Sequence, residues 1–113
     1  METTFARAQE LAGILTDAGL RVTADTRNIN PPCALLTPPA RLYDTMNGFT
    51  AEWHIWLLVP GSGTADSWIA LDGMLTILES ALSLESADPA VLPVTTGLAP
   101  LPAMDCIYRE NLA

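Results

Sequence analysis

The first hydrophobic pattern along the chain has the period of a helix. Between Phe5 and Leu15, apolar residues recur every three or four positions, and Ala18 extends the same stripe. The threonines before this stripe can cap a helix, and Gly19 is suited to end it in a left-handed conformation. We therefore predict a helix over residues 4–18.

Two short segments after this helix have the composition of strands. The first is Leu20–Asp25, and the second is Cys33–Thr37, which is apolar enough to be buried. Pro31 and Pro32 keep the connection between them out of a central strand, because proline cannot donate a hydrogen bond to a ladder. Pro38–Pro39 ends the second strand for the same reason.

The middle of the chain predicts a hairpin with a long second strand. Leu42–Met46 and Phe49–Val59 flank Asn47–Gly48, a pair that favours the type I′ turn of two-residue hairpins. Side chains alternate between the two faces of a strand, so the pattern within residues 49–59 separates into two sets. These two sets differ in polarity.

One face of this long strand is wholly apolar and includes Trp53, which we assign to the core. The opposite face begins with polar residues and becomes apolar at Trp56 and Leu58. Tryptophan is enriched where proteins bury surface against one another. We therefore predict that Trp56 and Leu58 contribute to an interface with another protein, and Trp56 is the stronger candidate.

A second helix follows a glycine-rich break in the pattern. Thr64 or Asp66 can cap it, and apolar residues recur at helical spacing from Trp68 to Leu82. This apolar stripe is wider than one packing surface usually requires. The helix is predicted to end before Asp88–Pro89.

The remaining residues predict a last hairpin in which Val91–Leu98 pairs with Ala103–Arg109. Pro93 and Pro102 place these strands away from central positions, or lie at their ends. The resulting order, α-β-β-β-β-α-β-β, predicts one α+β domain over residues 1–113. Such a domain has an antiparallel or mixed β-sheet with two helices on one face.

Composition adds a constraint on partners. The chain has 113 residues, a net charge of −8, and five basic residues that are all arginine. Without a run of bases, we expect no specific binding of nucleic acid and no binding to an anionic membrane. Half of the residues are hydrophobic and only 16% are charged, a balance that favours apolar surface buried by partners.

Two cysteines in 113 residues form no disulfide framework and no metal-binding spacing. The first residues lack the basic and apolar segments of a signal peptide, and no apolar run is long enough for a membrane span. We therefore expect a cytoplasmic protein with reduced thiols.

The chain offers little that resembles an active site. His54 is the one histidine, Ser62 lacks the full nucleophile-elbow motif, and no phosphate-binding loop is present. A pair of Cys33 as nucleophile and His54 as base stays open as an alternative. We predict that the protein is not an enzyme and uses no metal and no cofactor.

Four segments together resemble the tail terminator proteins of long, non-contractile-tailed phages, especially those of actinobacterial hosts. They are Val22–Asp25, Asn28–Leu36, Trp56–Gly61 and Leu101–Tyr108, each in the order and setting typical of that family. The resemblance covers nearly the whole chain and consists of layout and local sequence, with no catalytic motif.

The resemblance implies a structural protein of the virion tail that is assembled in the host cytoplasm. Such proteins form a homo-hexameric ring on the head-proximal end of the tail tube, stop polymerisation of the tube protein and dock to the head–tail connector. DNA passes through the channel without being bound specifically. The alternatives are another head–tail joining or minor tail protein of the same fold, and an acidic inhibitor-type binding protein.

Overall fold

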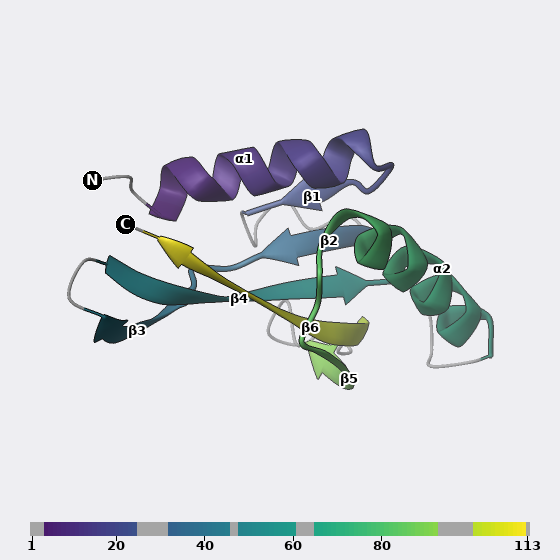
Figure 1. Cartoon of the computed structure of the whole chain (residues 1–113). Coiled ribbons are helices and arrows are strands. Elements are labelled where there is room, and N and C mark those ends of the chain that lie inside the picture. The colour runs from purple at the N-terminus through teal and green to yellow at the C-terminus, as the bar shows by residue number, and fades with distance from the viewer. Residues whose placement is uncertain (1–3, 25–31, 46–47, 61–64, 93–100, 113) are drawn as a thin grey trace.

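A mixed sheet covered on one face by two helices forms the body of the protein (Figure 1). The computed structural model describes residues 4–24, 32–45, 48–60, 65–92 and 101–112. The elements are α1 (Thr4–Asp17), β1 (Val22–Thr23), β2 (Cys33–Leu36), β3 (Ala40–Thr45), β4 (Gly48–Leu58), α2 (Ala65–Ala81), β5 (Ser86–Leu92) and β6 (Leu101–Leu112). Their order confirms the predicted α+β class.

Strand β4 is the centre of the sheet, whose order is β1-β2-β4-β6-β5. One side of β4 pairs antiparallel with β6 over the continuous register from Phe49↔Leu112 to Leu58↔Ala103. Strands β2 and β3 lie one after the other along its opposite side, both antiparallel to it. The parallel pair is β1 with β2, so the sheet is mixed.

A break separates β2 from β3 along the edge of β4. The register runs from Leu36↔Ile55 to Ala40↔Glu52, so residues 37–39 stand opposite only Trp53 and His54. Two of these three residues are prolines, which have no N–H to donate to β4. The Thr37 hydroxyl instead donates to the His54 carbonyl at 3.3 Å. The sheet therefore has a local irregularity beside its central strand.

The main core lies between the sheet and the helices. Both helices lie on the same side of the sheet (Figure 1). Helix α1 lies over β1 and β2, and α2 lies near the end of β4. Leu11 and Leu15 of α1 and Leu78 of α2 meet Trp53 of β4, and all four are fully buried. The assignment of Trp53 to the core is confirmed.

A smaller apolar cluster lies on the face of the sheet away from the helices. It consists of Cys33, Leu35, Leu58 and Ala103, with Trp56 and Ala90 packed against it. This cluster matches the part of the long strand where the second face becomes apolar. Each face of the sheet therefore has its own apolar contacts.

The end of α1 has the geometry that its sequence predicted. Gly19 has a φ of 108°, and its N–H donates to the Thr16 carbonyl at 3.0 Å. The Leu20 N–H donates to the Leu15 carbonyl at the same distance. These two bonds are a Schellman motif, which satisfies carbonyls that the helix leaves open. The helix ends at Asp17, one residue before the predicted end.

The two hairpins differ from their predicted boundaries. The pair Thr45↔Gly48 closes the first hairpin, so Gly48 belongs to β4 and has a φ of 149°; residues 46–47 lie outside the described part. Glycine tolerates this conformation because it has no Cβ.

The second hairpin begins earlier than predicted, because α2 ends at Ala81 and β5 starts at Ser86. Pro89 lies within β5, which is tolerated because β5 is the outer strand of the sheet. Pro102 is the second residue of β6, a strand with neighbours on both sides, so only its position near the strand end agrees with the prediction. Residues 93–98 of the predicted strand lie outside the described residues.

Candidate functional site

A charged cluster joins the start of the chain to its end beneath α1. Arg7 donates to both carboxylate oxygens of Glu110, from Nε at 2.9 Å and from Nη2 at 2.8 Å. The same carboxylate accepts from Trp53 Nε1 at 3.1 Å and from the Tyr108 hydroxyl at 3.2 Å. Arg7, Trp53 and Tyr108 thus all donate hydrogen bonds to the Glu110 carboxylate, and the bond from Trp53 fixes the orientation of its indole.

The pKa values of this cluster agree with an internal ion pair. Burial raises the pKa of Glu110, but the hydrogen bond and charge of Arg7 outweigh it, and the net pKa lies below its ordinary value. The pKa of Arg7 is raised, mainly by its hydrogen bond to Glu110. Burial raises the pKa of Tyr108. The cluster therefore links α1 to β6 through an ion pair between Arg7 and Glu110.

A second polar pair lies on the face away from the helices. His54 Nδ1 is 2.8 Å from Asp105 Oδ1, across the β4–β6 ladder, and the His54 ring stacks near Trp56 with centroids 6.2 Å apart. The alternative partner Cys33 is paired with Leu58, four residues farther along β4. At about 3.3 Å per residue that is roughly 13 Å. The structure therefore does not bring Cys33 and His54 together.

The remaining groups with possible chemistry give no assembled centre in the described residues. No set of three or more histidine, cysteine and acidic side chains there could hold a metal ion. Ser62 lies outside the described residues. Within the same residues, neither helix is long and apolar enough to cross a membrane.

The two predicted interface residues have different surroundings. Leu58 is fully buried by the chain itself, so its side chain has no surface to present to a partner. The reason is that β2, β6 and Trp56 already pack around it as part of the second cluster. Trp56 is partly buried on the same face, and its role in an interface stays a prediction.

Two of the large apolar residues that stay exposed lie on α2, within the stripe that the sequence predicted to be wider than one packing surface needs. Trp68 and Ile69 are each 69% exposed. The face that α2 buries starts instead at Ser67, continues through Leu71 and Leu78, and ends with Leu82 just after the helix. The Ser67 hydroxyl donates to the Pro60 carbonyl at 3.4 Å. The breadth of the stripe was the available signal, since one helix cannot bury residues all round its circumference.

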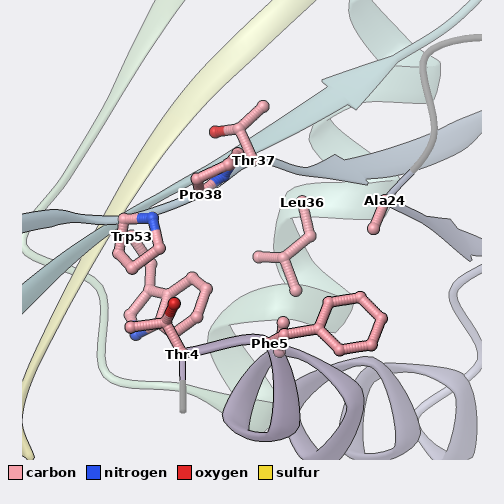
Figure 2. A pocket seen from close by; sticks show the side chains of 9 residues that line it. Thr4, Phe5, Ala24, Leu36, Thr37, Pro38 and Trp53 are labelled. Carbon is pink, nitrogen blue, oxygen red and sulfur yellow. The ribbon is translucent and has the colours of Figure 1, made fainter.

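A cleft opens at the start of α1, beside the middle of β4, where β2 ends before β3 begins. Figure 2 shows Thr4 and Phe5 of α1 on one side and Thr37 and Pro38 on the other. Its volume is about 150 Å³. The lining residues are Thr4, Phe5, Ala8, Ala24, Leu36, Thr37, Pro38, Pro39 and Trp53. Most of this lining is apolar, and Phe5, the first residue of the apolar stripe that predicted α1, is 66% exposed.

No protein-family model, curated protein or solved structure matches this chain. Two surfaces of the described residues combine exposed apolar side chains with nearby charges. The α2 patch consists of Asp66, Trp68, Ile69 and Asp72. The α1 cleft consists of the nine residues that line the cleft, with Phe5 as its exposed apolar residue.

Proposed function

We propose that this chain is a structural virion protein that caps the head-proximal end of a phage tail tube as a ring. The resemblance of its sequence to tail terminator proteins leads to this proposal. The α+β fold, with helices on one face of a mixed sheet, supports it, because it has the layout that the resemblance implies. The ring would stop polymerisation of the tube protein and dock to the head connector.

The observation that carries the proposal is the pair of separate apolar surfaces. In Figure 1 the first turn of α1 and the first turns of α2 lie at opposite ends of the molecule. A closed ring needs two different patches on each subunit, placed so that one subunit meets the next. Trp68 and Ile69 near the start of α2 and Phe5 at the start of α1 give each end an exposed apolar side chain.

The charge of the chain fits a channel through which DNA slides. Each copy has a net charge of −8, so a ring of several copies would be strongly acidic. Acidic groups facing the lumen would repel the phosphates of DNA and prevent adsorption during ejection. In this role the chain catalyses no reaction, and the His54–Asp105 pair is a cross-strand contact of the sheet.

Deletion of the gene from the phage that encodes it would test this function. We expect electron micrographs to show overlong tail tubes without heads, and wild-type chain supplied in trans to restore a uniform tail length. Uniform tails of normal length in the deletion would contradict the proposal. If those normal tails also lacked heads, the result would favour the alternative, a head–tail joining protein of the same fold.

A second test examines the ring by itself. Native mass spectrometry of the purified chain, over a range of concentrations, should show one closed oligomer, with six copies expected from the resemblance. An open series of increasing sizes would contradict closure. A chain that is monomeric in solution should still form the ring on isolated tail tubes, and failure there would count against the function.

A further inference from the structure

We infer that the α2 patch of one copy docks into the α1 cleft of the next copy, with the Trp68 indole as the inserted group. This contact rests on the proposed ring and names the surfaces that build it. Three properties of the two surfaces support the match: size, charge and position.

The size of the cleft suits one aromatic side chain. Apolar cavities of about 150 Å³ can hold a single benzene ring, and the α1 cleft has about this volume. Trp68 is 69% exposed, so most of its ring is available to a neighbouring copy. The floor of the cleft is already fixed, because Trp53 is fully buried and its indole is hydrogen-bonded to Glu110. Docking therefore requires little reordering of the receiving surface.

The charges around the two surfaces have opposite signs. Helix α2 carries Asp66, Asp72 and Glu79 and has no basic residue. At the cleft, the Arg41 guanidinium donates from Nη2 to the Thr4 hydroxyl at 3.3 Å and lies 4.9 Å from the centre of the Phe49 ring. Arg41 is exposed, so a positive charge borders the cleft. An acidic patch approaching this border is attracted, whereas two acidic patches would repel each other.

The positions of the surfaces favour a head-to-tail contact over a two-fold dimer. A two-fold contact places the same patch on both sides, which would bring Asp66 and Asp72 of two copies close together. A head-to-tail contact instead joins the start of α2 in one copy to the start of α1, which lines the cleft, in the next copy. Figure 1 shows these two helix starts far apart on the fold. Repetition of this contact generates a ring where the rotation closes.

Site-specific cross-linking distinguishes these arrangements. Ile69→Cys places a thiol beside Trp68, and Ala24→Cys places one in the lining of the cleft, both at exposed positions. The native thiols of Cys33 and Cys106 are buried, so a short bis-maleimide reaches the introduced ones. Mixing the two single variants should give a covalent heterodimer, while each variant alone gives no dimer.

Each other outcome overturns the contact. A dimer from Ile69→Cys alone would show a two-fold contact through α2. No heterodimer in a sample that native mass spectrometry shows to be oligomeric would overturn the contact and leave the ring itself standing. A chain that is monomeric both in solution and on isolated tail tubes would overturn the contact together with the proposed function.

Substitution of the inserted side chain gives the magnitude. Substituting alanine for an aromatic residue buried at the centre of an interface typically weakens association about 30-fold. We expect this loss of affinity for Trp68→Ala. Tyr43 is the matched control, because it is an aromatic residue that is 70% exposed on β3, outside both surfaces. Tyr43→Ala should change the dissociation constant less than about three-fold. Equal effects of the two variants, with thermal unfolding unchanged in both, would overturn the insertion of Trp68.

Charge exchange tests the complementarity. Arg41→Glu should weaken association, and adding Asp66→Arg and Asp72→Arg should restore it, because the signs on both surfaces are then reversed. Restoration measured by the same mass spectrometry would support the pairing. A triple variant that associates more weakly than Arg41→Glu alone would overturn it.

Discussion

Replacing Glu110 with glutamine should destabilise the protein by about 2 kcal/mol. The substitution preserves the volume of the side chain but removes its charge, and it leaves the Arg7 guanidinium without its main partner. Hydrogen bonds to charged groups contribute about 1.5–3 kcal/mol, and the Glu110 side chain is only 12% exposed. The amide of glutamine retains one carbonyl oxygen, which can accept from Trp53 or Tyr108, so the loss stays in the lower part of this range.

The assay is urea denaturation followed by circular dichroism, with Glu10→Gln as the matched control. Glu10 also binds Arg7, at 3.1 Å, but its side chain is 54% exposed on α1. Exposed ion pairs contribute between about 0 and 1 kcal/mol, so the control should lose less than about 0.5 kcal/mol. Equal losses in Glu110→Gln and Glu10→Gln would refute the conclusion that the buried contact anchors α1 to β6.

The effect of Glu110→Gln should also depend on pH in one direction. The pKa of Glu110 is lower in the folded protein than its ordinary value of 4.5, so the unfolded chain binds this proton more readily. Its stabilisation is therefore fully present above pH 4.5 and is lost as the pH falls through the folded pKa. The stability difference between wild type and variant should shrink on acidification, and a constant difference from pH 7 to pH 3 would contradict the linkage.

Four further predictions concern the backbone and the core. Gly19→Ala should lower the free energy of unfolding by about 1 kcal/mol, because alanine is strained at a φ of 108°. Gly73→Ala should raise the free energy of unfolding by about 0.5–1 kcal/mol, because a Cβ on this helical residue meets nothing within 4 Å. Thermal unfolding of both glycine variants measures the two changes in stability. Changes of the same sign in both variants would contradict this reasoning. Burial raises the pKa of the Cys106 thiol to about 12, and Cys33 is buried as well. A thiol reagent at pH 8 should therefore label neither cysteine until urea unfolds the chain. Leu58→Ala should cost about 2–4 kcal/mol in urea denaturation, and a loss below 1 kcal/mol would contradict its placement in the second cluster.

The sequence predicted the elements well where local rules decide them. The helical spacing between Phe5 and Leu15, followed by Gly19, predicted α1 to within one residue of its end. Alternation along residues 49–59 predicted both faces of β4 and the burial of Trp53. Helix period, strand period and turn chemistry act over a few residues, so one chain segment contains the information.

The boundaries around Pro89 show where local rules become insufficient. Proline opposes a central strand but is tolerated in an outer one, and only the assembled sheet shows that β5 is outermost. The positions of β2 and β3 in the sheet likewise have no local signal, because the sequence predicts them only as separate strands. Their shared place along one side of β4, and the cleft that their break creates, follow from pairing between segments.

For the candidate surfaces, the sequence by itself predicted more apolar surface than one copy of the chain needs to bury. Only the tertiary structure decided which of them stay outside: Leu58 is enclosed, whereas Trp68 is exposed. A helix packs against a sheet along one side, so the rotation of α2 about its axis, set by contacts such as Leu78, selects the buried residues. The Arg7–Glu110 pair, 103 residues apart, likewise has no local signature. Such contacts depend on long-range packing, which brings distant segments together only once the whole sheet has formed.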